Sequence, residues 1–163
     1  MKKNIFHTIS ALVLAACIMM LGFAGCSGNQ SYSFGPQENV SEISSEYQAK
    51  LQERLNAAGV APVGVSFYGY NATFDDQGRL TVEGFFRNRT GETITNLECD
   101  ITIRVENITV AYGHFSLPEE DFGTLESGDS RPWTLIFGSD DVINRGQDMS
   151  SYQVMVECNY TKA

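Results

Sequence analysis

The sequence has few basic side chains. Lys and Arg together number 11 against 20 Asp and Glu in 163 residues, which gives a formal net charge of -9. Nucleic-acid binding needs clustered Lys and Arg to displace counterions from the phosphates. The charge therefore argues against a nucleic-acid partner, and it suits cationic partners or divalent metal ions.

Histidine is also scarce, which limits the chemistry available. Of the two histidines, only His114 lies beyond the N-terminal apolar run, between Gly113 and Phe115. No nucleophile-elbow motif stands near it, and no His or Cys pair has the spacing of zinc ligands. General acid–base catalysis depends on a poised acid or base. We therefore expect a protein that is not an enzyme and has no cofactor, with His114 on the surface.

The chain lacks the calcium-loop pattern of an EF-hand, but it does carry carboxylate clusters in predicted loops. The densest cluster is Glu119, Glu120 and Asp121. Carboxylate oxygens in loops are the ligands that hard cations such as calcium prefer. A solvated acidic loop is the favoured interpretation, and a weak cation site formed by these three residues is the alternative.

There is only one long apolar run, residues 5–23, and two lysines precede it. A run of this length that ends in small residues and a cysteine predicts an export signal over residues 1–25. Residues 23–26, with the sequence FAGC, resemble the lipobox of bacterial lipoproteins. The resemblance implies that Cys26 becomes the first residue after cleavage and carries a diacylglyceryl group.

Two alternatives to Cys26 remain open. Cys17 follows Leu-Ala-Ala and also fits the lipobox, although cleavage there would leave the apolar residues 18–25 on the mature end. The apolar run could instead remain uncleaved as a transmembrane anchor. In each case we expect the bulk of the chain on the outer, extracellular side of the cytoplasmic membrane.

Beyond Cys26 the composition changes twice. Residues 27–39 are rich in Ser, Gly, Asn, Gln and Pro, so residues 26–39 are predicted to be the lipidated cysteine and a flexible tether. Residues 40–59 are predicted to form an amphipathic helix. Its apolar stripe could pack on its own domain, on another protein or on the membrane, and the first is favoured because the polar face is not basic. The stripe consists of Val40, Ile43, Tyr47, Leu51 and Leu55.

After Pro62 the apolar period changes from about 3.6 to two, which is typical of strands. The alternation is clearest over residues 97–105, where every second residue is apolar or cysteine. Six or seven short strands with no helical pattern between them predict an immunoglobulin-like antiparallel β-sandwich over residues 62–163, so the protein is expected to be mainly β.

Cys99 and Cys158 both fall on the apolar faces of their predicted strands. In an exported protein, two such cysteines are candidates for a disulfide that links the middle of the domain to its last strand. The alternative is a pair of buried free thiols, because cysteine is often a small core residue.

Several short motifs recur in one recognisable order: an aromatic pair followed by Arg-Asn, a Phe-x-Leu segment, a glycine before a turn, and Arg-Pro-Trp opening a strand. The residues that carry them are Phe85, Phe86, Arg87, Asn88, Phe115, Leu117, Gly123, Arg131, Pro132, Trp133 and Phe137. Over about residues 65–141 this order resembles the SLAP domain, a small extracellular β domain of Firmicutes. The FxLyD type of immunoglobulin-like lipoprotein domain is a looser match, since it lacks Pro-Trp.

The SLAP resemblance implies a location and a fold more than a mechanism, since that family has no established reaction. By its name the family is associated with surface-layer assembly and accessory secretion. It implies an interaction module that binds a cell-wall, surface-layer or secretion component, so that the partner is an envelope protein or a wall polymer. The alternative function is binding of a cation or small ligand through the acidic loops. Trp133 is expected to be a core residue.

Overall fold

The computed structural model describes residues 30–163. The predicted signal over residues 1–25 and both lipidation candidates, Cys26 and Cys17, lie outside the described residues. The elements, in chain order, are β1 (Ser31–Tyr32), the 3-10 helix η1 (Val40–Glu42), α2 (Ser45–Ala57), β2 (Gly64–Phe74), β3 (Leu80–Arg89), β4 (Ile94–Val105), β5 (Ile108–Leu117), α3 (Glu119–Phe122), β6 (Asp129–Phe137) and β7 (Gln153–Lys162).

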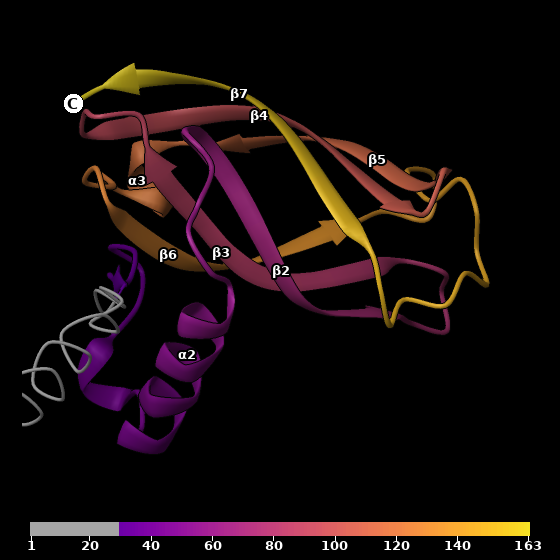
Figure 1. Cartoon of the computed structure of the whole chain (residues 1–163), viewed down its shortest axis with the longest axis horizontal. Helices are drawn as coiled ribbons and strands as arrows, with labels where there is room; N and C mark the ends of the chain where they lie inside the picture. The colour runs from indigo at the N-terminus through magenta and orange to yellow at the C-terminus, as the bar shows by residue number, and fades with distance from the viewer. Residues whose placement is uncertain (1–29) are drawn as a thin grey trace, which may run out of the picture.

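Two sheets stack face to face, with α2 below one of them (Figure 1). The four-stranded sheet has the order β1-β6-β3-β2, and the three-stranded sheet has the order β5-β4-β7. All paired strands are antiparallel except the short parallel pair of β1 and β6. The predicted antiparallel β-sandwich is confirmed.

The core follows directly from the period-two pattern. On β4, the odd-numbered residues from Leu97 to Ile103 are completely buried, whereas the even-numbered residues between them are partly or fully exposed. The inner faces of β3 and β6 meet them with Phe86, Leu135 and Phe137, which are also fully buried. Burying one such side chain contributes roughly 1.5–3 kcal/mol, so this shared face is what holds the two sheets together.

The predicted helix over residues 40–59 is divided in two. Residue Ile43 is extended, which separates η1 from α2. The hydroxyl of Ser44 then accepts a hydrogen bond from the backbone N–H of Tyr47 at 3.2 Å, so Ser44 is the N-cap of α2. Serine is among the best N-cap residues because its oxygen satisfies an otherwise free helical N–H.

The apolar stripe of α2 packs on its own domain. Leu51 and Leu55 are completely buried against Phe85 of β3, with Tyr68 and Tyr70 of β2 beside them. These three aromatic residues point to the outer face of the four-stranded sheet, so α2 covers that face. The first part of the stripe remains about half exposed.

Residues 30–39 were expected to belong to a flexible tether, but their first part is attached to the sandwich. Ser31 and Tyr32 pair with Asp129 and Ser130 of β6, and the backbone N–H of Ser33 donates to the carbonyl of Ser130 at 2.9 Å. Of the residues expected to be a flexible linker, only 27–29 lie outside the described part. Main-chain pairing to β6 explains the difference, because a local composition rule does not register a partner strand far along the chain.

Candidate functional site

The motif residue Arg131 is buried and links several segments of the chain by hydrogen bonds. Its side chain is only 4% exposed, and its Nη2 donates to the carbonyl of Thr124 at 2.9 Å and to Ser33 Oγ at 3.0 Å. Its Nη1 donates to the carbonyl of Phe122, and its guanidinium lies over the Phe122 ring. Burial lowers the pKa of Arg131. This side chain therefore joins the N-terminal segment, α3 and β6.

Asn88 has an equally structural position at the end of β3. It is completely buried, and its Nδ2 donates to the carbonyls of Glu92 and Leu125 at 2.8 and 2.9 Å. Its Oδ1 accepts from the backbone N–H and the hydroxyl of Thr90 at 2.9 and 2.8 Å. An asparagine amide offers two N–H donors and one oxygen with two lone pairs. All of this capacity is used to hold the turn after β3 and to join it to Leu125.

Arg87 ties down the connection that follows α2. It is 5% exposed, and its Nη2 donates to the carbonyl of Gly59 at 2.6 Å and to Oε1 of Gln30. Burial, and secondarily the nearby charge of Arg89, lowers the pKa of Arg87. The Arg-Asn motif thus organises two separate junctions of the chain.

The aromatic motif residues pack around Phe122 of α3. Its ring centroid lies 5.6 Å from that of Phe86 and 5.5 Å from that of Trp133, both in edge-on contact. Trp133 is half-buried and belongs to the residues packed against the main core. Such contacts add about 0.5–1.5 kcal/mol beyond area burial.

The remaining motif residues are also structural. Phe115 and Phe137 stack edge-on at 5.0 Å, and Leu117 is buried. Gly123 has a φ of 74°, and a Cβ there would come within 2.9 Å of the Cδ of Pro36. Only glycine fits this conformation and spacing without strain, which explains the glycine before the turn.

Pro132 is half-buried and lines a shallow groove between the N-terminal segment and β6. The groove has a volume of about 340 Å³ and is largely aromatic, with Phe34, Tyr47 and Tyr70 among its walls. The ring of Tyr70 is already covered by the guanidinium of Arg54, 4.2 Å from its centroid. Sequence reasoning missed the groove because its walls come from four distant segments.

Cys99 and Cys158 lie directly opposite each other on β4 and β7 and are joined as a disulfide in the structure. Their Cα atoms are 4.2 Å apart, close to the ~4.5 Å of a pair without mutual main-chain hydrogen bonds. Cys99 is completely buried, so this link lies inside the sandwich.

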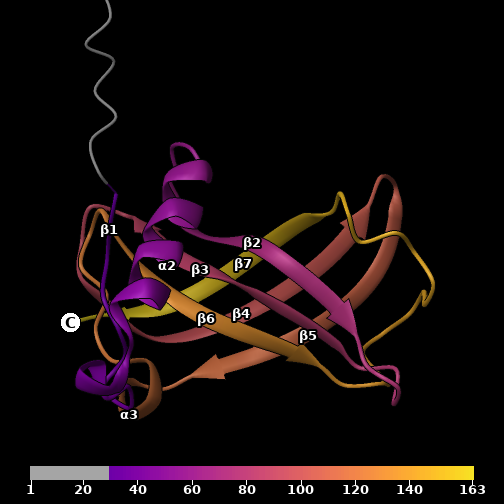
Figure 2. The ribbon, with the colours of Figure 1, turned by 90° about the horizontal axis from the view of Figure 1, so that it is seen from below.

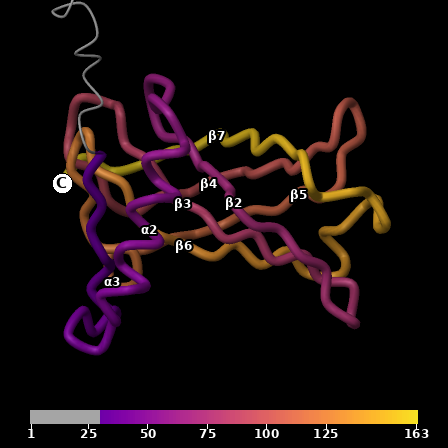
Figure 3. The backbone as a smooth tube through the Cα atoms, turned by 60° about the horizontal axis from the view of Figure 1, so that its bottom comes forward, coloured from indigo at the N-terminus to yellow at the C-terminus, as the bar shows by residue number. Residues whose placement is uncertain are grey.

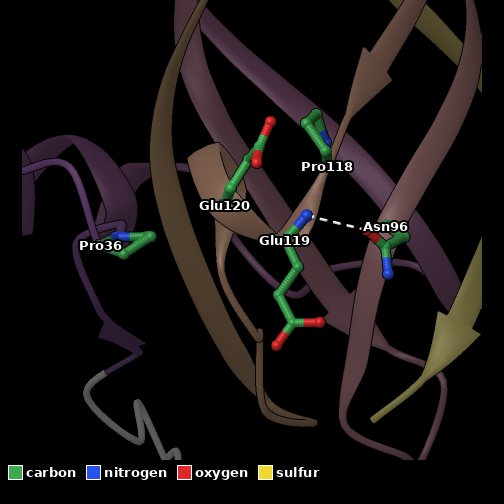
Figure 4. Close-up of a pocket in the computed structure, with 5 residues that line it drawn as sticks. All are labelled: Pro36, Asn96, Pro118, Glu119 and Glu120. Atoms are coloured by element: carbon green, nitrogen blue, oxygen red, sulfur yellow. Dashed lines mark hydrogen bonds between the residues drawn. The ribbon is translucent and has the colours of Figure 1, made fainter.

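The acidic connection forms the short helix α3. The backbone N–H of Glu119 donates to Oδ1 of Asn96 at 2.8 Å, while the carboxylates of Glu119 and Glu120 point in different directions (Figure 4). Asp121 is exposed as well. Across residues 30–163 no three His, Cys, Asp or Glu side chains gather as a metal-binding group.

His114 lies on the exposed face of the three-stranded sheet, between two carboxylates. Its Nδ1 is 3.0 Å from Oδ1 of Asp100, and its Nε2 is 3.1 Å from Oε2 of Glu98. The hydroxyls of Tyr112 and Ser116 donate to the same two carboxylates at 3.1 and 2.6 Å. Only the imidazolium can donate from both nitrogens, and the hydrogen bond to Asp100 is the main cause that raises the pKa of His114.

This network has no assembled nucleophile, because Ser116 donates to Glu98 and not to the imidazole. His114 is exposed, as the sequence predicts. Its partners were missed because they lie 14 and 16 residues away on the neighbouring strand. Only the register of β4 and β5 brings them together.

The outer edge of β7 is unpaired. β7 pairs with β4 on one side, and within residues 30–163 no strand is hydrogen-bonded to its other side, although β2 of the other sheet packs close to it. Because Cys158 is in a pair without mutual hydrogen bonds, its N–H and C=O point away from β4. Main-chain orientation repeats every second residue along a strand, so the N–H and C=O groups of Val156 and Val154 also point away from β4. β7 contains no proline, and its one lysine, Lys162, is its last residue.

These features define a small β-sandwich module with one docked helix. The family model of the SLAP domain matches residues 33–158, and the chain belongs to this family. The resemblance seen in the motif residues is confirmed, and the match extends beyond residues 65–141 to the N-terminal segment, α2 and β7. Membership indicates a module associated with the cell surface.

No curated protein and no solved structure matches the chain. Within residues 30–163, no helix combines the length and the apolar character that crossing a membrane requires.

Proposed function

We propose that this protein is a non-enzymatic interaction module, held by a lipid on Cys26 at the outer face of the cytoplasmic membrane. It binds an extended segment of a cell-envelope protein, which joins the three-stranded sheet beside β7. Membership of the SLAP-domain family supports the surface location. The apolar run and the FAGC motif support the anchor. The observation that carries the binding mode is the unpaired edge of β7.

The topology supports this choice of edge. In immunoglobulin-like sandwiches, one sheet pairs strand F with both C and G. Here β7 pairs with β4 as strand F pairs with strand C, and no strand of residues 30–163 takes the place of strand G on the other side of β7. Natural proteins usually protect open edges with proline, inward charges or bulges, and β7 has none of these between Val154 and Cys158. An added strand would satisfy the free main-chain groups there.

The side chains around this edge describe the segment that fits it. Met155 is 49% exposed on the outer face of β7, and Glu157 follows it on the same face. Val154 and Val156 are only partly buried at the rim of the core. An extended segment with alternate apolar side chains and a basic residue opposite Glu157 complements this edge.

To test the proposal, native envelope proteins are passed over the immobilised full-length protein, and those that are retained are identified by mass spectrometry. Met155→Lys places a positive charge at the edge and is expected to lower retention of the partner several-fold. The matched control is Ile136→Lys, because Ile136 is 56% exposed on the other sheet. In the complex, amide exchange at Val154 and Val156 is expected to slow.

Equal retention by both variants, or unchanged exchange at Val154 and Val156, contradicts strand addition at β7. Retention of a wall polymer alone contradicts a protein partner but preserves the envelope location. Absence of any retained component contradicts the interaction module itself.

A further inference from the structure

The connection between α2 and β2 presents two exposed valines. Val60 is 83% exposed and Val63 is 87% exposed, the highest values among the large apolar side chains of residues 30–163. Pro62 between them is exposed as well, whereas Ala61 is only 6% exposed. A single exposed valine on a surface needs no explanation, but two on one short loop form an apolar tip. We call residues 59–63 the valine loop.

The valine loop is held in this shape by partly buried hydrogen bonds. The carbonyl of Gly59 accepts from Nη2 of Arg87 at 2.6 Å, and the carbonyl of Ala61 accepts from Nη1 of Arg89 at 2.9 Å. Side chains of β3 thus hold two alternate residues of the loop, Gly59 and Ala61. Val60 and Val63 are presented to the solvent by an anchored backbone, which favours a partner that covers both.

The described chain begins beside this loop. Nε2 of Gln30 donates to the carbonyl of Gly59 at 2.8 Å, and Nε2 of Gln52 donates to the carbonyl of Gln30 at 2.8 Å. Figures 2 and 3 show the start of the described chain and the α2–β2 connection at the same end of the molecule. Cys26 precedes Gln30 by four residues, a reach of at most about 14 Å for extended chain.

One basic side chain lies beside the valine loop. Arg89 pairs in register with Gly64, immediately after the valine loop. The clusters Asp75-Asp76 and Asp140-Asp141 lie at the other end of the sandwich, because Leu80 pairs with both Phe74 and Phe137. The eleven residues of β2 separate the two ends by roughly 36 Å, several times the ~8 Å screening length. An anionic lipid surface attracts Arg89 and repels these aspartates, and it also repels Glu119 and Glu120, which lie at the valine-loop end because Leu117 pairs with Leu97 near the start of β4.

We propose that the valine loop contacts the lipid bilayer and inserts Val60 and Val63 into its interfacial region. The inference rests on the lipid anchor of the proposed function, and it adds a second attachment point that sets the orientation of the domain. The two acyl chains of a diacylglyceryl group already give stable membrane binding, so the contribution of the loop is the orientation of the domain.

The experiment measures the depth of the loop in a membrane. Mature protein isolated from membranes, which the proposed function expects to be lipidated at Cys26, is reconstituted in phosphatidylglycerol-containing vesicles whose lipids carry bromine high on the acyl chains. Val63→Trp is compared with Val40→Trp and with the wild type, whose only tryptophan is Trp133. Val40 is a matched control because it is an exposed valine, 48%, at the opposite end of α2, about 20 Å away by helical rise.

The expected result is bromine quenching of Val63→Trp well above the wild-type level, with Val40→Trp showing only the wild-type background. Flotation of the same vesicles reports on the anchor independently. Protein that floats without extra quenching at position 63 overturns the membrane contact and leaves the anchor intact. Protein that does not float overturns the anchor, and the contact that depends on it. Near-ultraviolet circular dichroism of each variant verifies the fold.

Discussion

Arg87 Nη2 donates a 2.6 Å hydrogen bond to the carbonyl of Gly59, so a buried side chain of β3 holds the loop that follows α2. The same guanidinium also contacts Gln30, the first described residue. One residue therefore joins the start of the domain, the end of the helix and the four-stranded sheet. Its neutral partners accept hydrogen bonds without supplying a counter-charge.

Replacing Arg87 tests this junction. Arg87→Leu is expected to lower the free energy of unfolding by about 1–3 kcal/mol, because partly buried acceptors lose a charged donor. Urea denaturation measures the change. The control is Arg79→Leu, whose ion pair with Asp75 is exposed and contributes about 0–1 kcal/mol. Similar losses in the two variants would contradict a special role for Arg87.

Asn88 is expected to be the more sensitive motif position. Asn88→Ala removes both donors and the acceptor that hold the turn after β3, so we expect a loss of about 3 kcal/mol. Thermal or urea unfolding provides the measurement. Asn71→Ala is the matched control, because Asn71 is exposed and makes one hydrogen bond, to Glu83. A loss at Asn88 no larger than at Asn71 would rule out the organising role.

The His114 network predicts a pH-dependent stability. The raised pKa of His114 means that its contribution is complete below the ordinary value of about 6.5 and is lost as pH rises through the raised pKa. The same hydrogen bond lowers the pKa of Asp100, whose contribution is lost as pH falls through that lowered value. Glu157 faces Asp100 from β7 and adds negative charge to this face.

Wild type is therefore expected to lose melting temperature relative to His114→Gln as the pH rises through the raised pKa of His114. An NMR titration of the imidazole gives the direct measurement, with a pKa above 6.5 as the expected outcome. The titration of His7, which lies outside the described residues, is identified by His7→Gln. A His114 pKa at or below the ordinary value would exclude the bridged imidazolium.

The link between Cys99 and Cys158 closes a loop over a sequence separation of 59 residues. The chain-entropy model assigns such a loop about 4 kcal/mol of stability. Reduction is therefore expected to lower the melting temperature of the wild type but not of the double variant Cys99→Ala, Cys158→Ala. Alkylation followed by mass spectrometry counts free thiols. Two alkylated cysteines at these positions in unreduced, denatured protein would indicate free thiols.

Calcium is expected to leave the melting temperature unchanged at millimolar concentration. The carboxylates of Glu119 and Glu120 point apart (Figure 4), so they do not present the several oxygens that calcium needs. A calorimetric scan with and without calcium measures the effect. A rise that Glu119→Gln and Glu120→Gln abolish would restore the acidic loop as a cation site.

Strands were predicted well because their signal is local. The alternation around Ile101 and the apolar positions of Cys99 and Cys158 follow from a side-chain period of two, and the structure puts all three residues inside. The helix was predicted less well, since a continuous 3.6-residue stripe gave no sign that Ile43 is extended. The apolar stripe correctly indicated Leu51 and Leu55 as packing residues.

The motif residues show a different limit. The order of the motif residues was enough to recognise the family. The structural roles of Asn88 and Arg131, however, depend on hydrogen bonds to main-chain carbonyls, which sequence patterns do not reveal. Asn88 is a buried strand residue whose side chain holds the turn that follows it. The cluster around His114 was invisible for the same reason.

The amino-acid sequence by itself determined the β-rich fold, its core positions, the export signal as a prediction and the family. These properties depend on neighbours along the chain, where covalent geometry sets which residues share a face. Tertiary structure alone decided that Gln30 lies beside Gly59, that Val60 and Val63 project from that end, and that β7 keeps an open edge. Each of these depends on contacts between segments distant in sequence, which a local pattern of residues does not encode.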